Sequence, residues 1–367
     1  MTHTNENRNT IPAILGIDLG KNLFHLHALD EKGKTLWAKA IKRENLIFEI
    51  QNFKSCIVGI EACGGSNYWH RTLSELGHEV RMITPQRAVA FREGQKNDKN
   101  DALAIAQAVM NPPTRLVTGK SLEQQEISSL HAMRNLTVRQ RTQMINHMRG
   151  TLSEYGVICR KGAKWFENNV AEILQKEIQA KTFPPAVARG LLIQLDNLKN
   201  CRTHINKLNQ EIDALSQKDV CQRLQTIPGV GTMISTMLYG HGGDVVHYET
   251  SSDFAASLGL VPRQHSTGGR QIYGGISKRG PIGIRATMIH GARSIVSAAR
   301  KKRGIGDKEA DSDLIEWGLQ CYDRMGMNKA TVAVANKMAR IAWKVMKTPG
   351  EVFQPRYAPR APLAAAA

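Results

Sequence analysis

The feature that most restricts the fold of this chain is the pattern of apolar residues near its N-terminus, where short runs alternate with turns. The runs at 14–18, 23–29 and 35–40 contain five to seven residues each, and the connection at 30–34 is polar and includes a glycine. Runs of this length between turn residues are typical of β-strands. Three of them in succession predict a β-meander.

Strand-like and helix-like patterns then alternate. Further apolar strand patterns lie at 56–60 and 79–83, and helical spacing occurs at 46–53, 68–76 and 98–110. A meander followed by alternating strands and helices predicts an α/β domain, which we place at residues 11–115. Residues 1–10 are polar, and we expect them to form a disordered lead-in.

After Pro112 and Pro113 the sequence becomes helical. Apolar residues recur there at steps of mostly three and four: Leu191, Leu195, Leu198, Ile205, Leu208, Ile212 and Leu215. This heptad-like spacing is typical both of a helical hairpin packed on itself and of a coiled coil between protomers, and spacing alone allows either. We expect a helical or coiled-coil region at 116–222, a mostly helical C-terminal domain at 223–350 and a disordered tail at 351–367.

The charge balance predicts a polyanionic partner. The 367 residues include 50 lysines and arginines against 32 acidic residues, which gives a net charge of +18. Such an excess attracts phosphate backbones through counterion release, so nucleic acid is the expected partner. The basic residues after position 284 and the arginines at 134, 139, 141 and 149 are candidate phosphate-binding surfaces. No long apolar run indicates a membrane.

The cysteines and the N-terminus predict a cytoplasmic protein. The six cysteines lie far apart without a CxxC pair, a pattern that suits reduced thiols better than disulfides or a zinc site. The first residues contain no apolar segment of the kind that export signals need.

Four carboxylates occupy chemically suggestive positions. Asp18 ends the first predicted strand, Glu61 ends a later one, and Asp98 and Asp101 share a face of the first turn of a helix. A cluster of like charge needs a cation, and Mg²⁺ prefers oxygen ligands, with Mn²⁺ as an alternative. Taken singly, each residue also has an ordinary explanation: Asp98 and Asp101 suit a helix N-terminus, Asp18 a turn, and Glu61 a solvated surface.

A second region is rich in glycine, hydroxyl and basic residues. Gly229 and Gly231 form a turn before a helix, where backbone N–H groups suit a phosphate. Ser266 lies downstream, in a segment whose glycines and cations suit attack by a hydroxyl on phosphorus. The cations of this segment are Arg263, Arg270, Lys278 and Arg279. The same composition also suits a basic loop that only holds phosphates.

Three N-terminal motifs carry a family resemblance. GIDLGK, IEACGG and NDKNDALAIAQA resemble the DEDD domain of the insertion-sequence 110 family of transposases, which are relatives of the pilin-inversion invertase. That domain is similar to the RuvC Holliday-junction resolvase, so the resemblance implies a ribonuclease-H-like fold. It also implies metal binding by Asp18, Glu61, Asp98 and Asp101.

The segment GLVPRQHSTGG…GGISKRG resembles the C-terminal domain of the same family, especially its 1111 subgroup. The resemblance implies a serine nucleophile that forms a phosphoserine link with DNA. Ser266 matches that serine, Thr267 lies one position away, and Ser277 is a weaker third choice. Pro281, after SKRG, departs from the family pattern.

The resemblance also implies site-specific recombination of an insertion sequence, guided by a bridge RNA, with acids and serine supplied by different subunits of a tetramer. Two other functions remain open at this stage. One is a metal-dependent, structure-selective nuclease that uses water and forms no covalent link. The other is a nucleic-acid-binding protein without catalytic activity.

Overall fold

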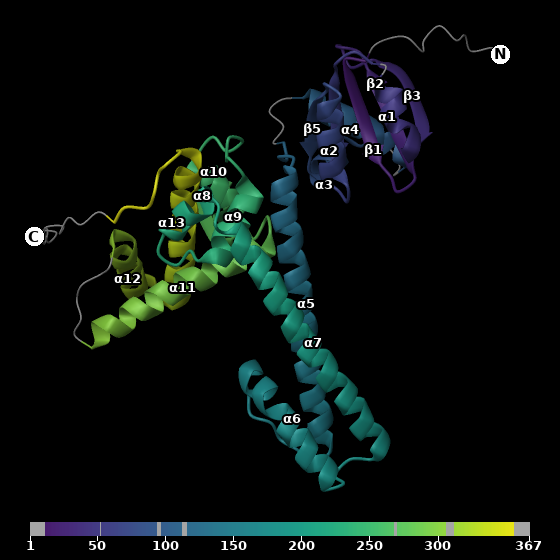
Figure 1. The fold of residues 1–367 in the computed structure, drawn as a ribbon. Helices are drawn as coiled ribbons and strands as arrows, with labels where there is room; N and C mark the ends of the chain where they lie inside the picture. The colour runs from purple at the N-terminus through teal and green to yellow at the C-terminus, as the bar shows by residue number, and fades with distance from the viewer. Residues whose placement is uncertain are drawn as a thin grey trace, which may run out of the picture. The chain divides into compact units, whose positions relative to one another are not determined.

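The computed structural model describes residues 12–51, 53–93, 97–111, 116–267, 270–305 and 312–355 (Figure 1). The chain forms two compact units, Met1–Gln125 and Glu126–Ala367. The first combines a sheet with helices and the second is mostly helical, so the predicted combination of an α/β N-terminal region with a helical remainder is confirmed. Within the described ranges, no helix is both long and apolar enough to cross a membrane.

A five-stranded sheet with the order β3-β2-β1-β4-β5 forms the centre of the first unit. β1 (Ile14–Leu19), β2 (Leu23–Leu29) and β3 (Thr35–Lys42) are the predicted antiparallel meander. β1, β4 (Ile57–Glu61) and β5 (Glu79–Ile83) run parallel to one another. Ile17 lies opposite Ile60, so the next residues, Asp18 and Glu61, lie near the carboxyl ends of these two parallel strands, at the same edge of the sheet.

Helices complete two hydrophobic cores on this sheet. They are η2 (Arg43–Asn45), α1 (Leu46–Ile50), α2 (Ser66–Glu75), α3 (Pro85–Phe91) and α4 (Asp98–Met110). In one core, Leu15 and Ile17 of β1 pack with Trp69 of α2. In the other, Ile14 packs with Ile105 of α4. Successive strand residues point to opposite faces, so β1 contributes to both cores.

Glycines beneath α4 allow this helix to lie close to the sheet. A Cβ atom at Gly16 would lie 2.2 Å from the carbonyl oxygen of Ala102, and one at Gly59 would lie 2.8 Å from Cγ2 of Val109. Alternation along the strands places Asp18 on the same face as Gly16, and Glu61 on the same face as Gly59. The close approach therefore brings the first turn of α4 to both acidic strand ends.

The second unit begins with three helices that share a core. They are α5 (Leu122–Glu154), which begins in the first unit, α6 (Ala163–Gln179) and α7 (Pro185–Leu215). Leu191, Leu195 and Leu198 of α7 share a buried core with α5 and α6, so packing within the chain accounts for these heptad positions. Three of the predicted phosphate-binding arginines have partners in this part of the chain. Arg134 donates a hydrogen bond to Asn209, Arg141 forms a salt bridge with Glu167, and Arg149 donates to the carbonyls of Arg160 and Gly162.

The rest of this unit packs around one long helix. The elements are α8 (Asp219–Gln225), α9 (Thr232–Gly242), α10 (Ser251–Ser257), α11 (Ile282–Gly304), α12 (Asp313–Met325) and α13 (Met327–Lys347). Val334, Met338 and Ala342 of α13 are fully buried in the shared core. Phe353, in the segment that the sequence assigns to the tail, packs on this core, and its backbone N–H donates to Oγ1 of Thr226 at 2.8 Å.

A β-hairpin replaces the loop that the sequence predicts around Ser266. β6 (Pro262–Thr267) pairs antiparallel with β7 (Arg270–Ile276). The described side chains of both strands are almost all exposed, so the segment has no apolar alternation that would mark it as strands. Its base is fixed by close packing instead, since a Cβ atom at Gly280 would lie 1.9 Å from the carbonyl oxygen of Ser257.

The contact at Gly16 generates a stability prediction. Gly16→Ala places a methyl group against the backbone of α4, so we expect the free energy of unfolding to fall by about 1–3 kcal/mol. Gly64→Ala is the matched control, because a Cβ atom at Gly64 meets nothing within 4 Å. Thermal unfolding of both variants checks this prediction, and equal melting temperatures would contradict the close approach of α4.

Candidate metal centre and serine hairpin

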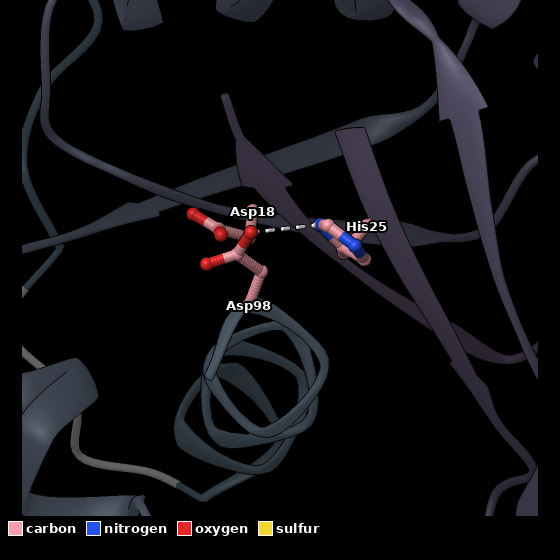
Figure 2. A group of neighbouring side chains, drawn as sticks. All are labelled: Asp18, His25 and Asp98. Atoms are coloured by element: carbon pink, nitrogen blue, oxygen red, sulfur yellow. Dashed lines mark ion pairs between the residues drawn. The ribbon is translucent and has the colours of Figure 1, made fainter. Parts of the chain in front are cut away.

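Strand register brings a histidine to the acidic edge of the sheet. Asp18 of β1 pairs directly with His25 of β2. Asp98, the first residue of α4, reaches the same place, and its Oδ2 lies 3.6 Å from Nδ1 of His25. Ligand atoms of Asp18, His25 and Asp98 all lie within 4.8 Å of one another (Figure 2). Two predicted acids thus meet, together with a third donor that the sequence analysis missed.

The register of the meander was the signal that could have identified His25. Asp18 and His25 flank the short turn between the first two predicted strands, and an antiparallel hairpin across that turn pairs them. The acidic motifs alone gave no reason to consider a histidine on the second strand.

The other two predicted acids act on this cluster electrostatically. Burial, followed by the nearby carboxylates of Asp101, Asp98 and Glu61, raises the pKa of Asp18 to about 6, while His25 lowers it. The four predicted carboxylates, Asp18, Glu61, Asp98 and Asp101, therefore interact electrostatically, and we call them the acidic group. Repulsion of this kind disfavours the ionised Asp18, and a bound cation would offset it.

Asp101 also has a cationic partner within the chain. Its Oδ1 lies 3.1 Å from Nη1 of Arg92, which follows α3, and both side chains are mostly buried. A salt bridge of this kind partly neutralises the acidic group. Asn97 caps the same turn, since its side chain accepts a hydrogen bond from the backbone N–H of Asn100 at 2.8 Å. Capping fixes the start of α4, where Asp98 and Asp101 lie.

Divalent cations fit the donor set of this group. Carboxylate oxygens are the ligands that Mg²⁺ and Mn²⁺ prefer, and imidazole nitrogen extends the range toward transition metals. The acidic group is therefore a candidate divalent-metal centre within the first unit.

The β6–β7 hairpin contains Ser266 and lies in the second unit, and we call it the serine hairpin. Ser266 occupies a backbone position opposite Gln271, and its side chain lies outside the described part of the structure. Thr267 pairs with Arg270, and both are exposed. His265, beside Ser266 in sequence, pairs with Ile272, and strand alternation assigns position 265 to the opposite face from position 266. Sequence adjacency therefore does not place His265 and Ser266 on one face.

The basic candidates divide between surface and core. Arg263, Lys278 and Arg279 are exposed, and Lys278 has a left-handed backbone with φ of 56°. Arg285, which the sequence assigns to a phosphate-binding surface, is instead buried. Its guanidinium donates to the carbonyls of Leu258, Arg279 and Gly280. That assignment was wrong, because the guanidinium fixes the base of the hairpin.

The two glycines before α9 differ in environment. A Cβ atom at Gly229, where φ is 82°, would lie 2.9 Å from the carbonyl oxygen of Gly291, so close packing on α11 requires a glycine there. Gly231 is the N-cap of α9, and a Cβ atom there meets nothing within 4 Å. Of the two, Gly231 is the one with open space beside it.

The raised pKa of Asp18 generates a stability prediction. An acid whose pKa rises on folding from 3.8 to about 6 costs stability as pH increases through that interval, and the full cost remains above it. Asp18→Asn removes this cost, so without metal at about pH 7.5 we expect the melting temperature to rise by about 2–4 °C.

The same variant should lose its response to Mg²⁺. Wild type should be stabilised by Mg²⁺ at about pH 7.5 and less so at about pH 5, where Asp18 is largely protonated. Differential scanning calorimetry with and without Mg²⁺ measures both effects, and the control is Asp213→Asn, at an exposed position of α7. A full Mg²⁺ response in Asp18→Asn would refute the metal centre.

Comparison with known proteins gives the family. A model described as "Transposase" and carrying the DEDD and IS110 labels matches residues 15–157. A second, described as "Transposase IS116/IS110/IS902 family", matches residues 221–305. The first match includes the acidic group and the second includes the serine hairpin.

Full-length relatives agree with these matches. The chain is 38% identical over 334 residues to the transposase for insertion sequence element IS1111A of Coxiella burnetii, covering 91% of this chain and 89% of the relative. It is 36% identical over 341 residues to the transposase for insertion sequence element IS1328 of Yersinia enterocolitica, covering 93% and 98%. The chain therefore belongs to the IS110 family of transposases, enzymes that act on DNA.

Proposed function

We propose that this transposase excises and inserts its element by site-specific recombination, with a divalent cation at the acidic group and a serine nucleophile on the hairpin. The observation that carries the proposal is the convergence of Asp18 and Asp98 with His25. These residues come from two strands and a helix. They also lie within the segment that matches the family model, which supports the same proposal.

Mg²⁺, or Mn²⁺ in its place, would be held by Asp18, Glu61, Asp98 and Asp101. A bound cation would stabilise negative charge on the oxygens of a phosphodiester displacement. Arg92 holds the Asp101 carboxylate within the group, and Asn97 fixes the turn that bears Asp98. The strand order of the sheet supports a ribonuclease-H-like, RuvC-like assignment for residues 11–115.

Ser266 is the proposed nucleophile. Its hydroxyl oxygen forms a bond to phosphorus while the bond from phosphorus to the 3′ oxygen breaks. The serine proton passes to a base and the departing 3′ oxygen takes up a proton, which leaves a 5′-phosphoserine and a 3′-hydroxyl. Exposed Arg263 and Arg270 on the same hairpin offer positive charge for the phosphate.

Further cations and partners belong to the same proposal. Lys278, Arg279 and the N-terminus of α9 at Gly231 are proposed phosphate contacts. The net charge of +18 supports binding of both DNA and a bridge RNA that supplies sequence recognition. We propose a tetramer in which the acids of one subunit act with the serine of another, with residues 116–222 as the helical region and 223–350 as the serine domain.

The nucleophile can be tested with purified protein, its co-purifying RNA, Mg²⁺ and end-labelled donor DNA. A denaturing gel should reveal a protein–DNA adduct in wild type. RNase treatment before the reaction should prevent the adduct from forming. Ser266→Ala and Asp18→Ala should reduce the adduct to background. Thr267→Ala is the matched control, because it removes the neighbouring hydroxyl group. This variant should retain most of the adduct, since Ser266 is the proposed nucleophile.

Two results would change the proposal. Loss of the adduct in Thr267→Ala but not in Ser266→Ala would move the nucleophile by one residue. Cleavage without any adduct, surviving Ser266→Ala, would support the metal-dependent, structure-selective nuclease instead.

A further inference from the structure

A basic and aromatic groove borders the serine hairpin in the second unit. It has a volume of about 1600 Å³ and is lined by α13, α12, β7 and the segment after α13. The first residues of α10 and β6 complete its wall. The proposed phosphate contacts Arg263, Arg270, Lys278 and Arg279 are not among the residues that line this groove.

Helix α13 contributes a row of cations to the groove. Lys329, Lys337, Arg340 and Lys344 all line it, at steps of eight, three and four residues. Two acids, Asp313 and Glu351, also line it, and Glu351 pairs with Lys344 at 2.9 Å. Positive charge therefore predominates along the helix, as a chain of phosphates requires.

One cation of this row contacts an aromatic ring, and a second ring that lines the groove is held by a hydrogen bond. Nζ of Lys337 lies 4.3 Å from the ring centroid of Trp317. The indole N–H of Trp343 donates to the carbonyl of Tyr248 at 3.1 Å, which fixes this second ring against the core. Cation–π contact orients the Lys337 ammonium without neutralising it.

Among the aromatic residues that line the groove, Tyr273 is exposed, whereas Trp317, Trp343 and Phe353 are partly buried. It lines the groove from β7 and is 61% exposed. Its hydroxyl donates to Oε1 of Gln271 at 2.8 Å, so the ring lies along the strand. An exposed aromatic ring beside a row of cations is the combination that binds unpaired bases.

The register of the hairpin relates the groove to the proposed nucleophile. Gln271 is opposite Ser266, and Tyr273 is opposite Gln264. Strand alternation assigns positions 264, 266, 271 and 273 to one face of the hairpin. A nucleic-acid strand with a base stacked on Tyr273 would therefore lie along the face of the hairpin that contains position 266.

We propose that this groove binds an unpaired stretch of the DNA strand that is cut, with phosphates along α13 and a base stacked on Tyr273. The choice of the cut strand rests on the proposed function, because it depends on Ser266 as nucleophile. A duplex is the poorer fit, since its bases are already stacked on one another and cannot use the ring of Tyr273.

Fluorescence anisotropy of full-length protein with a labelled single-stranded DNA oligonucleotide tests the groove. The buffer contains EDTA, so metal-dependent chemistry contributes nothing to the signal. We expect the Lys337→Ala/Arg340→Ala double variant to bind about tenfold more weakly, with a salt slope reduced by about 1.4. Tyr273→Ala should weaken binding at least about fivefold, and Tyr273→Phe should retain it because the ring remains.

The matched control is Lys199→Ala/Arg202→Ala on α7, which removes the same charges at the same spacing from exposed positions. Equal weakening in the control, unchanged binding by Tyr273→Ala, or equal losses with duplex DNA would overturn the proposal. Tighter binding of RNA of the same sequence would overturn the assignment to DNA. Circular dichroism confirms that each variant is folded.

These results are distinguishable from those for the proposed function. Normal oligonucleotide binding with no serine adduct would refute the serine mechanism alone. A normal adduct with unchanged oligonucleotide binding in the groove variants would refute the groove alone.

Discussion

The close packing of α4 on β1 and β4 is the constraint on which the acidic group depends. Gly16 and Gly59 have no side chain at the two positions where α4 lies closest to the sheet, and Asp18 and Glu61 follow two residues later on the same faces. The helix begins at the same edge, so Asp98 meets Asp18 and His25. Desolvation and the neighbouring carboxylates then raise the pKa of Asp18. Repulsion between these carboxylates favours the binding of a cation.

The sequence allowed the sheet and the acids to be predicted because their signals are local. Short apolar runs mark strands, and the position of Asp18 at the end of such a run places it at a sheet edge. His25 required the register of the β1–β2 pair, which depends on the turn. The pairing of Arg92 with Asp101 required the packing of α3 near α4, which no local pattern encodes.

In the second unit, local patterns were less informative. The β6–β7 hairpin was missed because almost all of its described side chains are exposed, on both faces, so the sequence has no apolar alternation there. What fixes it is contact between distant residues, as at Gly280 and Ser257. Arg285 belongs to the same arrangement, since a buried guanidinium that binds carbonyl oxygens has the same sequence appearance as one that faces DNA.

A cation at the edge of the first sheet is therefore the central requirement of the proposed chemistry. Anomalous diffraction from crystals grown with Mn²⁺ tests this claim most directly. We expect a strong anomalous peak within bonding distance of carboxylate oxygens of Asp18 and Asp98. An ordered acidic group with no peak, or a peak bound only elsewhere, would contradict it.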